Sequence, residues 1–340
     1  MVSKDLKVCV IGGGWYGCHI ALCLKKRGVK VTVLEKDSSI FNGASGYNQN
    51  RLHQGFHYPR CKRTRLQSKR GFHLFRKHYE PLLIELDYNL YGIPFNSSLI
   101  DFDTYKDIMV ATGLNFEDVS AVCPFPLKNI NGVIDCEEAV INPTLAKTYF
   151  ESELKEEIIV NHEVDKKTFR DLSNKYDYVI DCTWGGLSKR EHRYYESCIY
   201  FIAQSKNYYK MGLTLMDGSF FSIYPLNEKE HTVTHVEHTP MKVFDNQKEA
   251  YEFNSECSKD NQLIMRKQLE FTKSIEEYYP KFSNDFDIND VRFAVKTKDR
   301  SGQDSRYVTI EKEDNILRVN SGKIDTVFDA ESLIMSEVFS

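Results

Sequence analysis

The sequence contains no apolar run near the roughly 20 residues that a membrane-spanning helix needs. It also has no large excess of charge of one sign, because 45 basic and 49 acidic residues give a formal net charge of −4. A basic field that would attract nucleic acid is therefore missing. Strand character begins within a few residues of Met1, which leaves no room for a signal peptide. We expect neither a nucleic-acid partner nor a membrane span.

The nine cysteines include no CxxC pair and follow no regular spacing. Cys9, Cys18, Cys23 and Cys182 lie in apolar segments. An odd number of scattered cysteines is typical of reduced thiols in a cytoplasmic protein, whereas a secreted disulfide framework has paired ones. Internal repeats and low-complexity segments are absent, and a chain of 340 residues predicts two domains.

What the chain does have is a dinucleotide-binding pattern at its start. Residues 7–11 read as a strand, Gly12 to Gly17 as a glycine turn, and the run to Arg27 as a helix that Gly28 ends. A second strand over residues 29–34 leads to Glu35. Strand, glycine turn, helix, strand and acid, in this order, are the parts of a Rossmann unit.

Each of three glycines of the turn has a physical task. Gly12 permits the tight turn, Gly14 lets the backbone approach a pyrophosphate, and Gly17 lets the helix pack close to the strand. The helix N-terminus offers N–H groups and a positive dipole end to the phosphates. Glu35 can accept both ribose hydroxyls and would repel a 2′-phosphate, so the pattern predicts NAD or FAD.

The remaining chain divides into a parallel-sheet part and an inserted part. The alternating strands over residues 198–205, 211–216, 219–225 and 232–239 predict an antiparallel insertion, with Asp217-Gly218 as a hairpin turn. We further expect helices over residues 65–86, 105–112, 251–279 and 327–338, and strands over residues 90–95, 98–102, 158–164, 176–182, 291–295, 307–310 and 316–319.

Two further segments favour FAD over NAD. Residues 176–186, with the run Thr183-Trp-Gly-Gly186, and residues 320–326, Asn-Ser-Gly-Lys-Ile-Asp-Thr, resemble the returning strand and the C-terminal flavin loop of the D-amino-acid oxidase superfamily. Residues 42–55 resemble the segment that passes the flavin ring in that superfamily. Glycine oxidase, sarcosine oxidase and L-2-hydroxyglutarate dehydrogenase are among its members, and the order of segments agrees along nearly the whole chain.

The resemblance implies an α/β fold in which a Rossmann-type FAD-binding domain carries an inserted antiparallel-sheet substrate domain. We place the discontinuous FAD-binding domain at residues 1–75, 150–193 and 290–340, and the substrate domain at residues 76–149 and 194–289. The positions that the resemblance and the glycine pattern assign to FAD are Gly12, Gly14, Trp15, Tyr16, Gly17, Glu35, Lys36, Ser45, Asn50, Arg51, Leu52, Val164, Thr183, Gly185, Gly322, Lys323, Ile324, Asp325 and Thr326.

Lys323 has the clearest electrostatic task of these residues. Reduction leaves negative charge at the pyrimidine end of a flavin, and Lys323 at the start of the last helix would add a positive charge to the helix dipole there. Gly322 would let backbone N–H groups approach the ring. The alternative is a solvent-exposed lysine in a turn.

The substrate side is predicted from the run between Asn50 and Arg60. His53 and His57 are candidates for a base or an anion-binding group. Arg51, Arg60 and Arg306 are candidates for binding a carboxylate or phosphate group. Hydrogen-bonded histidines that orient a loop, and arginines in ordinary surface ion pairs, remain as alternatives. Some relatives attach flavin through a histidine in this region, so His53 is also a possible attachment point.

Some features depart from the superfamily. Trp15-Tyr16 is bulky for the glycine turn, and Val295-Lys296-Thr297 stands where the amino-acid oxidases usually carry an arginine-proline pair, so their carboxylate clamp is not carried over. His231, His235 and Glu237 share one strand face but span more than about 20 Å, too far for one tetrahedral ion. We expect no metal site.

The predicted function is that of an FAD-dependent oxidoreductase, an oxidase or dehydrogenase that takes hydride from a CH–NH or CH–OH group of a small polar substrate derived from an amino acid, a hydroxy acid or a sugar. The alternative is a non-redox flavoenzyme such as a nucleotide-sugar mutase or isomerase, which would use reduced FAD. A third class is a binding protein that has kept the fold and lost the chemistry. The sequence leaves substrate, electron acceptor and oligomeric state open.

Overall fold

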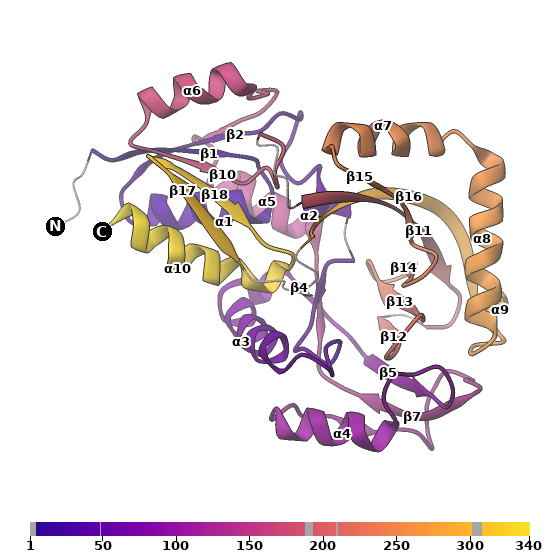
Figure 1. Ribbon diagram of the computed structural model, residues 1–340. Coiled ribbons are helices and arrows are strands. Elements are labelled where there is room, and N and C mark those ends of the chain that lie inside the picture. Colours follow the sequence, from indigo (N-terminus) through magenta and orange to yellow (C-terminus); the bar gives the residue numbers. More distant parts are fainter. Residues whose placement is uncertain (1–4, 48, 188–192, 209, 301–307) are drawn as a thin grey trace. The chain divides into compact units, whose positions relative to one another are not determined.

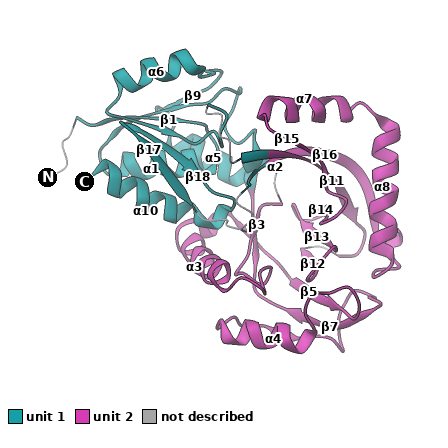
Figure 2. Cartoon of the chain, in the orientation of Figure 1, with its two compact units in different colours: residues 1–48, 143–194, 297–340 teal, residues 49–142, 195–296 magenta. Residues whose placement is uncertain are grey.

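The computed structural model describes residues 5–47, 49–187, 193–208, 210–300 and 308–340. The chain forms two compact units, shown in Figure 2. Unit 1 contains Met1–Asn48, Pro143–Tyr194 and Thr297–Ser340, and unit 2 contains Gln49–Asn142 and Tyr195–Lys296. Each unit has its own sheet, and the chain passes between them several times.

Unit 1 is built on a six-stranded sheet with the strand order β17-β18-β10-β1-β2-β9. Every neighbouring pair is parallel except β17 and β18, which are antiparallel. The strands are β1 (Lys7–Ile11), β2 (Lys30–Leu34), β9 (Ile158–Ile159), β10 (Tyr178–Asp181), β17 (Thr309–Glu313) and β18 (Ile316–Asn320). Because β1 is buried over nearly its whole length, it reads as an apolar run without alternation.

Helix α1 (Trp15–Lys26) connects β1 to β2 and is buried along the face that meets the sheet. It ends in a Schellman motif, in which Gly28 N–H donates to Lys25 O and Val29 N–H donates to Leu24 O. Gly28 has φ +83°, a conformation that glycine adopts without strain. The predicted helix end is therefore confirmed.

Figure 1 shows α1 and α10 on one side of the unit 1 sheet and α6 on the other. Helix α10 (Val327–Val338) has the predicted bounds, and it follows a short 3-10 helix, η2 (Ile324–Thr326). The other helices of the unit are α2 (Ala44–Tyr47), α5 (Pro143–Glu153) and α6 (Lys166–Lys175). Asp165 caps α6 by accepting from two backbone N–H groups of its first turn. Helices α5 and α6 have no counterpart among the sequence expectations.

Unit 2 is dominated by a nine-stranded sheet, in the order β15-β11-β14-β13-β12-β5-β7-β6 with β16 paired to β11. Most pairs are antiparallel, as predicted, but β5 and β12 run parallel. The strands are β5 (Tyr88–Pro94), β6 (Glu117–Asp118), β7 (Ile130–Asp135), β11 (Arg193–Ser205), β12 (Met211–Leu215), β13 (Phe221–Pro225), β14 (Glu230–His235), β15 (Pro240–Phe244) and β16 (Phe286–Asp299).

Helices cover this sheet through two hydrophobic clusters. Phe271 and Ile275 of α8 (Asn261–Glu276) lie in a buried cluster with Phe201 and other sheet residues. Tyr105 of α4 (Phe102–Ala111) lies in another with Tyr91. The unit also contains α3 (Lys62–Tyr79), η1 (Glu80–Leu82), α7 (Gln247–Cys257) and α9 (Phe282–Asp285).

A small three-stranded sheet, β3-β8-β4, completes unit 2. Its strands are β3 (Arg51–Leu52), β4 (Leu83–Glu85) and β8 (Ala139–Ile141). Arg51 pairs with Val140 in an antiparallel register. The pairing brings the run after Asn50 beside residues that lie almost ninety positions later in the sequence, which matters for the candidate site.

The strands predicted over residues 158–164 and 232–239 are shorter in the structure and end at Ile159 and His235. Three other local predictions are wrong for identifiable reasons. Residues 98–102 form no strand, because Asp101 accepts from Thr104 N–H and caps α4 instead. The helix predicted over residues 65–86 ends at Tyr79, where Pro81 in η1 breaks it and the chain enters β4. The helix predicted over residues 251–279 is two helices, and Asp260 caps the second by accepting from Leu263 N–H.

The two units differ in extent from the expected domains, chiefly because residues 49–75 belong to unit 2 and residues 143–149 to unit 1. The pairing of β3 with β8 explains the first difference. The assignment of cofactor and substrate to particular residue ranges stays a prediction.

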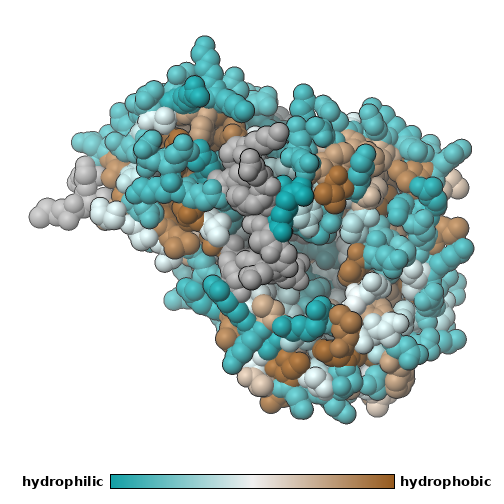
Figure 3. Space-filling model, viewed as in Figure 1, coloured by the Kyte–Doolittle hydropathy of each residue, from teal (hydrophilic) through white to brown (hydrophobic). Residues whose placement is uncertain are grey.

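Hydrophilic residues cover most of the face seen in Figure 3, and hydrophobic ones form separate small groups among them. Scattered hydrophobic side chains are normal on a protein surface. Among the described residues, no helix combines the length and the hydropathy that crossing a membrane requires. The nine cysteines, all at described positions, are free thiols.

Candidate functional site

The glycine turn of unit 1 leaves no space for side chains. An added Cβ would lie 1.9 Å from Gly12 O at Gly17, 3.0 Å from Cys182 O at Gly12, and 2.9 Å from Ser45 Oγ at Gly14. Gly12 also has φ +103°. Gly12 therefore requires glycine for its conformation, and Gly17 requires it because backbone lies against it. The neighbour of Gly14 is the end of the Ser45 side chain, which can move, so the predicted approach of a pyrophosphate to Gly14 stays a prediction.

Glu35 is held at the end of β2 by backbone donors. Its Oε2 accepts from Gly13 N–H at 2.6 Å and its Oε1 accepts from Asp37 N–H at 2.9 Å. The side chain is buried, and each carboxylate oxygen has a second lone pair with which it can accept a hydroxyl. The neighbouring Lys36 is exposed.

The side chains of the bulky pair, Trp15 and Tyr16, pack inside unit 1. The Trp15 ring packs against Phe41 and Phe150, and the Tyr16 hydroxyl donates to Lys323 O at 2.5 Å. The Trp15 amide donates to Ser45 Oγ at 2.9 Å. Large side chains are tolerated at these two positions because both are buried in the core of unit 1.

The loop after β10 contains two consecutive residues with positive φ, at the position of its glycine pair. Trp184 and Gly185 have φ +60° and +89°, and Asp181 Oδ1 accepts from Thr183 N–H at 2.9 Å. Val164, by contrast, is buried in a hydrophobic cluster with β1 residues, so it can reach a ligand only through its backbone.

Lys323 is buried at the start of the last helix and forms an ion pair of 3.0 Å with Asp325. The alternative of a solvent-exposed lysine is therefore wrong. Because Asp325 neutralises the lysine, its field at any neighbouring group is weaker than that of a lone cation. Gly322 is exposed, Ile324 is half-buried and Thr326 is buried with its hydroxyl 2.7 Å from that of Tyr16.

These residues fit a flavin adenine dinucleotide. The glycine cradle, which an added Cβ would fill, and the positive dipole end of the α1 N-terminus suit a pyrophosphate, and the fixed Glu35 carboxylate suits a ribose. Each of the individual cofactor contacts remains a prediction.

A second polar site lies in unit 2, where five segments bring together Arg51, His57, Tyr91, Glu138 and Thr214, here called the Arg51 cluster. Arg51 is buried and donates from Nη2 to Thr214 Oγ1 at 2.7 Å. Its guanidinium lies 3.8 Å from the centre of the Tyr224 ring, a cation–π contact. Its Nη1 lies 3.1 Å from Nδ1 of His57.

Glu138 is the acidic member of the cluster. Tyr91 places its hydroxyl 3.0 Å from Oε2, which also accepts from Asn89 Nδ2 at 2.9 Å, and Oε1 accepts from Gln54 N–H at 3.2 Å. Burial raises the pKa of Glu138 to about 7, although the nearby Arg51 opposes this shift. A carboxyl that titrates near neutral pH can exchange a proton under ordinary conditions.

The two predicted histidines lie together in this unit. The rings of His53 and His57 are 5.9 Å apart and nearly parallel, and Tyr58 contacts both. His57 Nδ1 is 3.1 Å from the Tyr91 hydroxyl, which links it to Glu138. Asn50 and Leu52, on either side of Arg51, are buried, and Asn50 has φ +52°.

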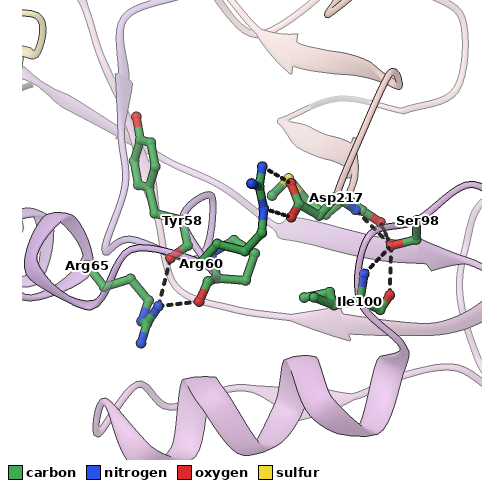
Figure 4. Close-up of polar contacts among 8 residues, drawn as sticks. Tyr58, Arg60, Arg65, Ser98, Ile100 and Asp217 are labelled. Atoms are coloured by element: carbon green, nitrogen blue, oxygen red, sulfur yellow. Dashed lines mark hydrogen bonds and ion pairs between the residues drawn. The ribbon is translucent and has the colours of Figure 1, made fainter. Parts of the chain in front are cut away.

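Figure 4 shows Arg60 turned toward Asp217. Its Nε donates to Asp217 Oδ2 at 2.5 Å and its Nη2 to Oδ1 at 3.4 Å. Arg65 points the other way and donates to the carbonyl oxygens of Tyr58 and Pro59. The substrate role of Arg60 stays a prediction, and that of Arg306 lies outside the described residues.

Two other sets of titratable residues have structural explanations. His231 and His235 are buried, and burial lowers the pKa of each to about 4, so both are neutral near pH 7. His19, Cys23 and Glu331 come within 4.8 Å of one another in unit 1. Arg27 pairs with Glu331 at 3.1 Å, so this group is an ion-pair cluster between α1 and α10.

Glu138, Tyr91 and Asn89 are not among the residues that the sequence pattern predicts for a site. Asn89 and Tyr91 lie two apart on β5, so their side chains share one face, and this spacing was the one available signal. Glu138 precedes β8 in a segment without a motif, and only the pairing of β3 with β8 places it near Arg51.

Comparisons with known proteins agree with this fold. The profile of the FAD dependent oxidoreductase family, DAO, matches residues 7–183. The chain is 35% identical to the FAD-dependent monooxygenase FPY4 of Fusarium mangiferae, over 96% of this chain and 89% of that protein. It is 26% identical to the FAD-dependent monooxygenase kojA of Aspergillus flavus, over 97% of this chain and 85% of that protein.

Solved structures give the same fold at low sequence identity. Glycine oxidase from Geobacillus kaustophilus has a TM-score of 0.72 and 14% identity, with 98% of this chain and 95% of that one covered. L-alpha-glycerophosphate oxidase from Mycoplasma pneumoniae, with FAD bound, also has a TM-score of 0.72 and 14% identity, with 99% and 95% covered. The fold class and the FAD dependence expected from the sequence are thereby confirmed, and the chain belongs to the DAO family of FAD-dependent oxidoreductases.

Proposed function

We propose that this flavoenzyme oxidises a CH–NH or CH–OH group of a small polar substrate and that the Arg51 cluster of unit 2 binds that substrate. FAD, when bound, supplies the hydride acceptor. The observation that carries the proposal is the Nε of Arg51, a buried donor without a hydrogen-bond partner among the described residues. A buried donor left unpaired costs free energy, so an acceptor on a bound substrate would remove that cost.

The charge of the cluster supports an anionic or strongly electronegative substrate group. When Glu138 is protonated, Arg51 is the one charged member of the Arg51 cluster apart from any charge on His57. A buried guanidinium binds a carboxylate or a similar group more strongly than an exposed one does, because water competes less. We expect affinity for such a substrate to fall as Glu138 ionises.

His57 is the proposed proton acceptor of the cluster. It is half-buried, and its Nδ1 lies 3.1 Å from Arg51 Nη1 and 3.1 Å from the Tyr91 hydroxyl. Oxidation of a CH–OH group requires removal of the hydroxyl proton, and an imidazole nitrogen is suited to this. A CH–NH substrate would need the same group to accept the ammonium proton.

The test is anaerobic mixing of the purified holoenzyme with panels of amino acids, hydroxy acids and sugar derivatives. Bleaching of the flavin by one class supports the proposal. For the responsive substrate, Arg51→Met should lower the second-order rate of flavin reduction at least a hundredfold, and His57→Asn should lower the limiting rate at least tenfold. Arg63→Met changes an exposed arginine of α3 and serves as the matched control.

A monooxygenase is the second candidate, favoured by the names of the curated relatives and by the 35% identity to one of them. It would be reduced by a nicotinamide donor and would transfer oxygen to the substrate, so the substrate alone would leave the flavin oxidised. A mutase or isomerase would convert its substrate without net reduction of the flavin. Product analysis after single turnovers separates the three outcomes.

A further inference from the structure

A continuous chain of polar groups joins Glu138 to His57 through Tyr91. The Tyr91 hydroxyl lies 3.0 Å from Glu138 Oε2 and 3.2 Å from Oε1, and 3.1 Å from Nδ1 of His57. Arg51 Nη1 lies 3.1 Å from the same Nδ1. One ring nitrogen therefore has two potential partners, and it can share a hydrogen with each of them only in particular protonation states.

Counting hydrogens limits the arrangements. A guanidinium only donates, a tyrosine hydroxyl has one hydrogen to give, and an imidazole nitrogen either carries a hydrogen or accepts one. If Tyr91 donates to an ionised Glu138, it has no hydrogen left for His57. Its oxygen can then only accept, and the favourable arrangement is that Nδ1 of His57 carries a hydrogen and donates it.

The opposite arrangement follows when Glu138 is protonated. The carboxyl O–H donates to the Tyr91 oxygen, and the Tyr91 hydrogen turns toward Nδ1 of His57. Nδ1 must then accept, from Tyr91 or from Arg51, and the ring hydrogen moves to Nε2. The contact between Arg51 and His57 favours this second state, since Nη1 is a donor.

We propose that Glu138 is a positioning residue whose ionisation, passed on through the Tyr91 hydroxyl, selects which nitrogen of His57 carries the hydrogen. The proton balance is simple. As Glu138 gives its hydrogen to Tyr91, Tyr91 gives its own to Nδ1, and Nε2 releases one to solvent. One proton leaves the network for each Glu138 that ionises, and Nε2 gains the lone pair that a general base needs.

The titration of Glu138 depends on the charged and titratable groups near it. Among the described residues these include Arg51 of β3, Tyr91 of β5, Tyr105 of α4, Cys136 before β8 and Tyr224 of β13, with His57 joined through Tyr91. Burial raises the pKa of both Tyr91 and Tyr224, so neither carries charge near neutral pH. Arg51 is then the one cation among these groups apart from any charge on His57, and it favours ionisation of Glu138.

This coupling of Glu138 to His57 through the Tyr91 hydroxyl is here called the relay. It rests on the proposed function in one respect, namely that His57 acts as the base. If it does, flavin reduction by substrate should accelerate about tenfold as Glu138 ionises, since only the ionised state leaves a lone pair on Nε2. Loss of substrate affinity over the same pH range would appear in KM, whereas the gain of the base would appear in kcat.

Imidazole ¹⁵N spectra of the ¹⁵N-histidine-labelled holoenzyme test the tautomer without any turnover. The His57 signals are assigned from their loss in His57→Asn. Between about pH 6 and pH 9, Nδ1 of the wild type should change from acceptor to hydrogen-bearing. Glu138→Gln, whose amide can donate to Tyr91 at every pH, should keep the hydrogen on Nε2 throughout, and Tyr91→Phe should uncouple His57 from Glu138.

Glu137→Gln is the matched control, since this neighbouring side chain is 63% exposed and pairs with Arg76 outside the cluster. It should leave the His57 spectra and the kinetics as in the wild type. Identical His57 spectra in the wild type and in Glu138→Gln at pH 9 would overturn the relay. A tautomer change as expected, together with unaltered flavin reduction in His57→Asn, would support the relay and refute the proposed role of His57 as base.

Discussion

The glycine turn of unit 1 and the Arg51 cluster of unit 2 are both polar sites, but they are constructed differently. The turn presents backbone amides that come from a short run of sequence, with Glu35 as its fixed carboxylate. The cluster presents side chains from β3, β5, β12 and two loops, assembled by sheet pairing. Backbone geometry is robust to most substitutions outside the glycines, whereas a side-chain network depends on each member.

The largest effect on FAD content and stability is expected from Gly17→Ala, because the glycine turn has no room for an added Cβ at this position. Gly17→Ala places a Cβ 1.9 Å from Gly12 O, so the α1 N-terminus must move away from β1. We expect loss of most bound FAD and destabilisation by about 3 kcal/mol or more. Flavin absorbance per protein and thermal unfolding measure both quantities.

Gly43→Ala is the control for this substitution, because nothing lies within 4 Å of its added Cβ. It should retain FAD and stability. Full flavin content in Gly17→Ala would mean that the turn can widen, and that the backbone site is as adaptable as the side-chain cluster.

An intermediate effect, on the pH dependence of stability, is expected from Glu138, the buried carboxyl of the Arg51 cluster. Burial raises the pKa of Glu138 from an ordinary 4.5 to about 7, so between these values the folded protein binds a proton that the unfolded chain has lost. This contribution to stability is complete below pH 4.5 and disappears as pH rises through 7. Its full size is about 3 kcal/mol.

Glu138→Gln removes this dependence, and the comparison uses thermal unfolding of the wild type and the variant at pH 5 and pH 8. The wild type should lose more stability than the variant on going to pH 8. Equal losses would mean that Glu138 ionises in the folded protein as it does in water, and that the cluster is better solvated than its burial indicates.

The smallest effect is expected from Arg60→Ala. The Arg60 side chain is 62% exposed although Asp217 is 10% exposed, and an ion pair with one solvated partner contributes less than about 1 kcal/mol. Flavin content should be unchanged. A fall in the rate of flavin reduction by substrate would support the substrate role predicted for Arg60, and an unchanged rate would assign it to the ion pair with Asp217.

The fold was predictable where local patterns decide structure. The strand–glycine–helix run, the last helix and the hairpin at Asp217-Gly218 follow from periodicity, capping and turn chemistry. Predictions failed where a single polar residue decided an element boundary, as Asp101 and Asp260 did by capping helices. Apolar periodicity alone does not resolve such boundaries.

The sequence by itself determined the dinucleotide motif and the family resemblance, because a glycine turn works through backbone atoms that are close together along the chain. It also named Arg51 and His57. Only the tertiary structure decided that the Tyr91 hydroxyl contacts the Glu138 carboxyl. It also decided that Asp325 forms an ion pair with Lys323 and that Asp217 forms one with Arg60. Side chains far apart in sequence meet through the register of paired strands, and that register is fixed by burial over the whole sheet.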